Sequence, residues 1–170
     1  MGVTYTRGSD VATLDPKQLS EQLRTVVAGG MAWLKKIPDA DAARPEREGK
    51  WSAKQVIGHL IDSAVNNLGR IVRMQVAQGA KLPGYQQEEW VAVQHHAQRE
   101  WGQLLQAWDV LNAHVAWAVA HVEKTQLTNR GEVAGTELTL GFLIEDYIAH
   151  MEHHLQALRR WADRSGVIGV

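Results

Sequence analysis

Two histidines four residues apart, His150 and His154, carry the clearest chemical signal in the sequence. They lie in a segment with helical periodicity, and side chains at this spacing project from the same face of a helix. Neutral imidazole is a common metal ligand, so the pair can hold a divalent ion at two points. The chain has no cysteine, which excludes thiolate ligands and a catalytic thiol. A complete site needs a third ligand from elsewhere in the chain, and His59 is the best candidate.

The residues around this pair exclude the zinc-protease mechanism that also uses two histidines at this spacing. In that motif a glutamate follows the first histidine directly, and here the position is Met151. Glu152 lies about 200° around the helix from His150 and cannot serve as the general base. His153 is a competing ligand, because spacing alone also allows it to pair with His150. The apolar face of the helix favours His154, since His153 projects towards the edge of that face.

Composition and charge narrow the class of protein. A chain of 170 residues with a formal net charge of −1 fits a single domain over 1–170. The interspersed charges favour neither nucleic acid nor a membrane as a partner. The first ten residues contain no apolar signal core, and no run of residues reaches transmembrane length. We therefore expect a cytoplasmic protein.

Hydrophobic periodicity and capping residues predict an all-α fold. Long helices are expected over 16–37, 53–78, 101–122 and 140–163, with a short extra helix over 88–93 before the third. Asp15 is the expected N-cap of the first helix, Ser52 with Gln55 forms a capping box for the second, and Thr139 caps the last. Residues before Leu14 are expected to form a loose arm. Residues 39–50, 79–87 and 125–137 are expected to be loops. Four long helices without a strand pattern predict a four-helix bundle.

The second predicted helix carries a polar strip beside its apolar stripe. The apolar stripe contains Val56, Ile57, Leu60, Ile61, Ala64, Leu68, Ile71 and Val72. The polar strip contains His59, Asp62, Ser63, Asn66, Arg70 and Arg73. Such a strip is either a solvated face or the wall of a polar pocket, and its two arginines favour an anionic or carboxylate-bearing ligand.

Two motifs together resemble the DinB/YfiT-like superfamily of metal-binding helical bundles. Lys50-Trp51-Ser52 runs into Gly58-His59-Leu60-Ile61-Asp62, and His150-x-x-x-His154 follows near the C-terminus. The resemblance implies a four-helix bundle with an up-down-down-up course. It also implies that His59, His150 and His154 bind a divalent metal, Zn²⁺ or Ni²⁺. Some members of the superfamily are thiol S-transferases or hydrolases, and dimers are common, so a homodimer is expected.

Further residues are candidates for a pocket around the metal. They are Asp62, Asn66, Arg70, Tyr85, Trp90, His95 and Asp146. Asp146 lies one turn before His150 and could orient its imidazole, or it could simply be a charge favoured near the helix N-terminus. His95 is a candidate for the pocket mouth. We interpret His96, His114 and His121 as ordinary surface or groove residues.

Three histidine ligands leave coordination positions open, which is typical of a catalytic site. We therefore expect a metal-dependent enzyme of the thiol S-transferase or hydrolase type. Its substrate would be a small molecule, for which a low-molecular-weight thiol is a candidate. The alternatives are a non-catalytic metal-binding or stress-related module, and a helical interaction protein without a metal. A tight, dry pocket would favour the non-catalytic module, whereas a wide cleft lined by Arg70, Arg73 or Tyr85 would favour the enzyme.

Overall fold

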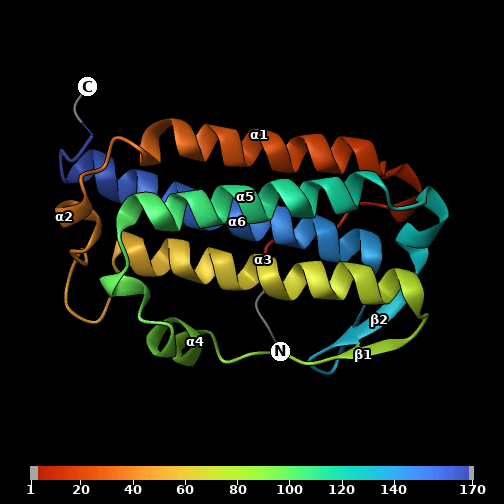
Figure 1. The fold of residues 1–170 in the computed structure, drawn as a ribbon. Coiled ribbons are helices and arrows are strands. Elements are labelled where there is room, and N and C mark those ends of the chain that lie inside the picture. The colour runs from red at the N-terminus through yellow and green to blue at the C-terminus, as the bar shows by residue number, and fades with distance from the viewer. Residues whose placement is uncertain (1–3, 169–170) are drawn as a thin grey trace.

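The computed structural model describes residues 4–168 and consists mainly of four long helices. These are α1 (Pro16–Leu34), α3 (Ala53–Val76), α5 (Trp101–Ala120) and α6 (Leu140–Arg164). In Figure 1, α1 and α6 run in one direction along the bundle, and α3 and α5 run in the opposite direction. The predicted four-helix bundle with an up-down-down-up course is confirmed.

The packing of the four helices places α3 and α5, which run in the same direction, side by side (Figure 1). Helix α5 packs against α1, helix α3 packs against α6, and α3 and α5 also pack against each other. A chain cannot connect two parallel neighbours by a short turn, so the segment from 77 to 100 returns along the outside of α3 (Figure 1). This return segment becomes part of the site described below.

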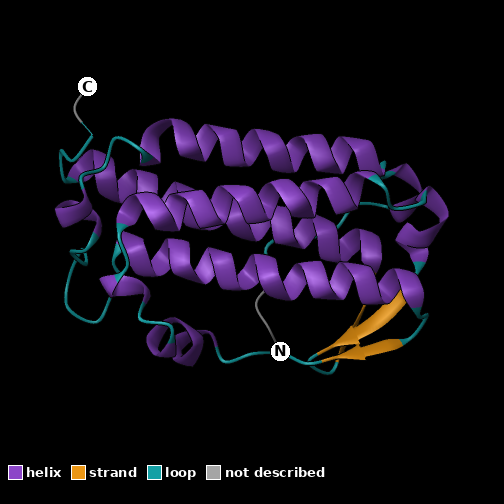
Figure 2. Ribbon diagram, in the orientation of Figure 1, coloured by secondary structure: helices purple, strands orange, loops and turns teal. Residues whose placement is uncertain are grey.

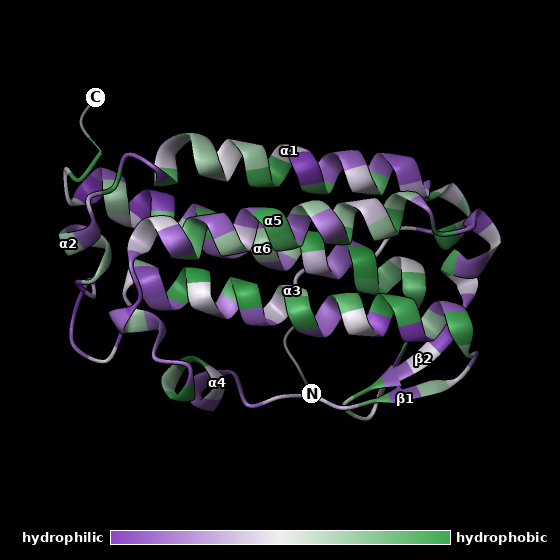
Figure 3. Ribbon diagram, in the orientation of Figure 1, coloured by the Kyte–Doolittle hydropathy of each residue, from purple (hydrophilic) through white to green (hydrophobic). Residues whose placement is uncertain are grey.

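The core is formed by apolar stripes that face the bundle axis. Figure 3 shows hydrophobic and hydrophilic residues alternating along each long helix, as amphipathic helices require. Fully buried members from all four helices include Leu23, Leu34, Ile57, Leu60, Ile71, Leu104, Trp108, Ile144 and Ile148. Val72 was predicted to belong to the stripe of α3 but is 46% exposed. Met74 is buried instead, because the buried face lies slightly further around the helix than the sequence suggested.

The predicted helix starts are present. Asp15 accepts hydrogen bonds from the backbone N–H groups of Lys17 and Gln18, and Thr139 accepts one from Phe142. At the start of α3, the Ser52 side chain and the Gln55 side chain satisfy each other's backbone N–H groups. These side chains satisfy amide donors that the first turn of a helix leaves without a partner.

All three predicted loops contain regular structure (Figure 2). The short elements are η1 (Val11–Thr13), α2 (Asp39–Ala42), β1 (Ala80–Leu82), α4 (Gln87–Val93), η2 (His96–Gln98), η3 (Lys124–Thr128), β2 (Arg130–Val133) and β3 (Thr136–Thr139). Strand β1 pairs in parallel with β2, and β2 pairs antiparallel with β3. The expectation of a strand-free chain was therefore wrong, because strands this short leave no visible alternation in the sequence. Helix α4 was predicted within one residue of its observed start.

The expected loose arm is also ordered where the structure describes it. The backbone N–H groups of Tyr5 and Thr6 donate to the Asp146 carboxylate, at 2.6 and 3.1 Å. Ser9 donates to the Glu145 carboxylate from its backbone at 2.9 Å and from its hydroxyl at 2.6 Å. These bonds attach the arm to the first half of α6. Within residues 4–168, no helix is long and apolar enough to span a membrane.

Candidate metal centre

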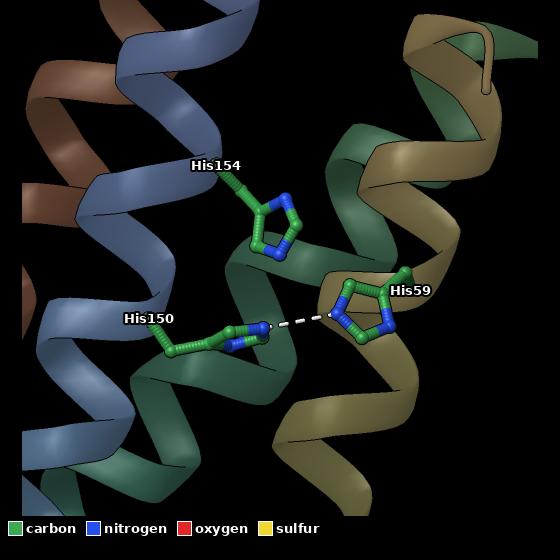
Figure 4. Close-up of side chains that lie close together, drawn as sticks. All are labelled: His59, His150 and His154. Carbon is green, nitrogen blue, oxygen red and sulfur yellow. Dashed lines mark hydrogen bonds between the residues drawn. The ribbon is translucent and has the colours of Figure 1, made fainter. Parts of the chain in front are cut away.

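Three histidines from two helices converge inside the bundle. His59 comes from α3, and His150 and His154 come from adjacent turns of α6, with the three rings turned towards one space (Figure 4). The Nε2 atoms of His59 and His150 are 3.0 Å apart. One nitrogen from each of the three residues lies within 4.8 Å of the others. His153 is exposed and does not belong to this group.

The distances and burial fit a divalent ion. Zinc–nitrogen bonds of about 2.0–2.1 Å place two tetrahedral ligand atoms roughly 3.3 Å apart, close to the separation of the two Nε2 atoms. His59 is fully buried and His150 is 8% exposed. Burial and the neighbouring imidazoles lower the pKa of His150 to about 2 and that of His154 to about 4. Burial also lowers the pKa of His59. All three rings are therefore neutral near pH 7, which is the form that binds metal.

Neighbouring side chains contact the rings of His59 and His150. Trp51 lies against His59 with ring centroids 5.3 Å apart. Ser63 Oγ lies 3.4 Å from Nδ1 of His150, so the hydroxyl can accept the proton of that nitrogen. Nδ1 of His59 is buried without a hydrogen-bond partner. Asp146 was considered as a partner for His150, but its Oδ1 instead accepts the two backbone N–H groups of the arm.

The arm places an aromatic ring beside the histidines. The Tyr5 ring centroid lies 4.8 Å from that of His150, 5.2 Å from that of His153 and 6.3 Å from that of His154. Burial, with a smaller contribution from Asp146, raises the pKa of the Tyr5 phenol, so it stays protonated. Tyr5 thus forms a wall of the site, although it belongs to the arm that was expected to be loose.

A cavity of about 580 Å³ opens next to the histidine cluster. His150, Ser63 and Asn67 line it, together with Arg70 and Tyr85. The remaining walls come from the arm, from the β2–β3 hairpin and from the first turns of α6. A space of this size accommodates a drug-sized molecule.

The Arg70 guanidinium is fixed at the side of this cavity. Its Nη1 donates to the Asn67 side chain at 3.3 Å, and its Nη2 donates to the carbonyl of Pro83 at 3.1 Å. The guanidinium lies 6.0 Å from the centre of the Tyr85 ring. Burial raises the pKa of Tyr85 to about 12, so its hydroxyl is a hydrogen-bond donor at neutral pH.

Four of the candidate pocket residues do not line the cavity, each for a local reason. Asn66 turns back to its own helix and donates to the carbonyl of Asp62 at 2.8 Å, and Asn67 takes its place at the cavity. Trp90 packs against Tyr85 with centroids 5.0 Å apart. His95 is exposed in the left-handed conformation with φ 54°. Asp62 is buried against Gln94 and His96, and Arg73, from the same strip, is exposed.

Sequence reasoning missed His96, which is 3% exposed and packs against Gly58 of α3. The signal available was the glycine one residue before His59, because a glycine within a helix can mark close approach by another segment. His114 and His121 are exposed, as expected.

Comparison with known proteins agrees with this architecture. The family model of the DinB superfamily matches residues 22–158. A curated relative from Geobacillus kaustophilus, named "Putative metal-dependent hydrolase GK0616", is 28% identical over 152 residues, covering 87% of this chain and 80% of the relative.

Two solved structures share the fold. YfiT from Bacillus subtilis, described as a probable metal-dependent hydrolase with an unusual four-helix bundle topology, matches with a TM-score of 0.86 and 18% identity, covering 96% of this chain and 94% of YfiT. A mycothiol-dependent maleylpyruvate isomerase matches with a TM-score of 0.64 and 11% identity, covering 96% of this chain and 64% of that protein. The three-histidine group and the metal-dependent relatives support a divalent metal in this protein. Because the family model matches most of the chain and the bundle is shared with YfiT, the chain belongs to the DinB superfamily.

Proposed function

We propose that this protein is a metal-dependent enzyme that transfers a low-molecular-weight thiol to a small-molecule substrate. His59, His150 and His154 would bind the metal, for which Zn²⁺ and Ni²⁺ are the candidates. The observation that carries the proposal is the cavity of about 580 Å³ that reaches His150. A metal that only stapled two helices together would need no such space beside its ligands.

The polar groups of the cavity favour a thiol over water as the nucleophile. Activation of water is commonly assisted by a carboxylate that acts as general base. Among the described residues that line the cavity, the carboxylates are Asp146 and Glu137. Asp146 is engaged by the arm, and Glu137 forms an ion pair with Arg130. A thiol has a much lower pKa than water and depends less on such a base.

A divalent ion at the three histidines would act as a Lewis acid and lower the pKa of a thiol that reaches it. The chain's own residues would then position the reactants. Arg70 would bind an anionic part of the thiol or of its acceptor, because its guanidinium faces the cavity and is already held by Asn67 and Pro83. Tyr85 would donate a hydrogen bond to the same group. Tyr5 and the rest of the arm would cover the metal, so that a substrate would approach it from the side of the cavity.

Hydrolysis is the second candidate. The names of the two relatives support it, since the Geobacillus protein is named a putative and YfiT a probable metal-dependent hydrolase. The mycothiol-dependent isomerase supports the thiol-based proposal in the same way. A homodimer is part of the proposal, and light scattering of the purified protein would test it.

Metal analysis of protein purified without a histidine tag is the first test, and about one divalent ion per chain is expected. Parallel screens for thiol transfer and ester hydrolysis then separate the two reactions. Once a substrate is identified, Arg70→Lys should raise KM at least tenfold and leave the metal content unchanged, since lysine cannot reproduce the forked contact. His154→Ala should lose both metal and activity. A metal-free wild-type protein, or an Arg70→Lys variant with wild-type kinetics, would contradict this mechanism.

A further inference from the structure

A buried carboxylate lies on the helix that carries His59, outside the cavity. Asp62 is 2% exposed and follows His59 by three residues on α3. Its Oδ1 accepts a hydrogen bond of 2.6 Å from Nε2 of Gln94, at the end of α4. Its Oδ2 is buried and has no hydrogen-bond partner. Burying a carboxylate is costly unless other groups compensate its charge, so this side chain requires an explanation.

His96 approaches the same carboxylate from the return segment. The ring is 3% exposed, and its Nε2 lies 3.5 Å from Oδ1 of Asp62. The return segment can bring His96 this close because Gly58 has no side chain at the point of contact. Asp62 therefore lies between Gln94, which donates a hydrogen bond to it, and His96, whose ring nitrogens form no hydrogen bond.

Oδ2 of Asp62 is an acceptor without a donor, and Nδ1 of His59 can be a donor without an acceptor. Nε2 of His59 points at His150, so the proton of the ring belongs on Nδ1 when Nε2 binds a metal. Nδ1 is buried without an acceptor, and Oδ2 of Asp62 is buried without a donor, one turn further along the same helix. The negative charge of Asp62 also opposes the effect of burial on the pKa of His59. Histidine ligands of metals commonly have such a carboxylate partner, which orients the ring and increases its basicity.

We infer that Asp62 is a positioning residue of the metal centre that acts through His59 and is itself fixed by the hydrogen bond from Gln94. This inference rests on the proposed binding of a metal by the three histidines. Asp62 would then supply a buried negative charge close to His59, one of three neutral residues that would hold the dication. The alternative is that Asp62 only attaches the return segment to α3, with no effect on the metal.

The two possibilities differ in their effect on metal affinity. The dissociation constant for Zn²⁺ is measured by competition with a chromophoric chelator, in wild-type protein, Asp62→Asn and Asp39→Asn. Asp39 is the matched control, because its carboxylate attaches α2 to Lys54 of α3, at 2.8 Å, and to the backbone N–H of Trp101 of α5, also at 2.8 Å. Thermal melts of the metal-free proteins record the loss of stability separately.

Asp62→Asn should weaken Zn²⁺ binding by about 10- to 100-fold and shift the visible absorption bands of the Co²⁺-loaded protein. Asp39→Asn should lower the melting temperature and leave the Zn²⁺ affinity unchanged. If Asp62→Asn does not fold, Gln94→Met at an exposed position removes the 2.6 Å bond and should still weaken Zn²⁺ binding severalfold. Wild-type affinity and an unchanged Co²⁺ spectrum in a folded Asp62 or Gln94 variant would overturn the inference. A wild-type protein that binds neither ion would instead refute the proposed function.

Discussion

Gly58→Ala is the substitution that tests most directly how the return segment packs on α3. A Cβ atom at this position would lie 2.6 Å from Cβ of His96 and closer still to two atoms of its ring. Carbon atoms do not approach to such distances, so η2 would have to move away from α3. The displacement would also draw His96 away from Asp62, its neighbour at 3.5 Å.

The expected size of the effect follows from two opposing contributions. Alanine in place of glycine within a helix favours folding by about 1 kcal/mol. Overpacking of a close contact costs about 1–3 kcal/mol, and the upper part of that range applies because the clash involves Cβ as well as the ring. The net result should be a loss of about 1–2 kcal/mol, which lowers the melting temperature of a chain of this size by roughly 2–8 °C.

Urea and thermal melts of the metal-free protein measure this loss, and Gly29→Ala is the matched control. Gly29 also lies within a helix, is exposed, and has no atom within 4 Å of a built Cβ, so the same substitution should stabilise the protein by about 0.5–1 kcal/mol. Combining Gly58→Ala with His96→Ala removes the two ring contacts but keeps the contact with Cβ of residue 96, so part of the loss should disappear. A Gly58→Ala variant that is stabilised as much as Gly29→Ala would show that His96 does not pack here.

Two further predictions concern the histidines and the arm. The lowered pKa values of His150 and His154 mean that the unfolded chain, with histidine pKa values of about 6.5, binds more protons than the folded one in mild acid. The free energy of unfolding of the metal-free protein should therefore be largest above pH 6.5 and fall as the pH drops towards 4. The fall should be shallower in His154→Gln. Urea melts measure this free energy, and equal values at pH 7.5 and 5.5 would contradict the prediction. Asp146→Ala removes the acceptor of two arm N–H groups and should speed the extraction of metal by a chelator, followed by stopped-flow absorbance. Glu123→Ala, at the N-cap of η3, should leave the extraction rate unchanged. Equal extraction rates in the Asp146 variant and the wild type would exclude a covering role for the arm.

The parts of this structure that the sequence predicted are those determined by residues near one another in the chain. The capping box of Ser52 and Gln55 spans three residues, and its hydrogen bonds do not depend on the rest of the fold. The apolar stripe of α6 placed His150 on the buried face of its helix, because helical geometry alone relates these positions. The convergence of His59 with that face required the superfamily resemblance, since nothing local relates residues 91 positions apart.

The parts that the sequence did not predict depend on partners far away along the chain. The pairing of Ala80 with Gly131 joins strands of three and four residues, too short to show alternation. Tyr5 donates its backbone N–H to Asp146, 141 residues away, and a polar N-terminal segment gives no sign of that partner. Asn66 and Asn67 are adjacent on α3, so a small difference in the rotation of the helix decides which of them reaches the cavity.

The course of the bundle explains why the return segment takes part in the site. Because α3 and α5 run in parallel, the chain after α3 has to travel back along the outside of the same helix before α5 can begin (Figure 1). That helix carries His59, so the return segment passes the histidine cluster on its way. It contributes Tyr85 to the cavity and then Gln94 and His96 to Asp62. An antiparallel connection between α3 and α5 would be a short turn at the far end of α3, and both groups of contacts would be absent.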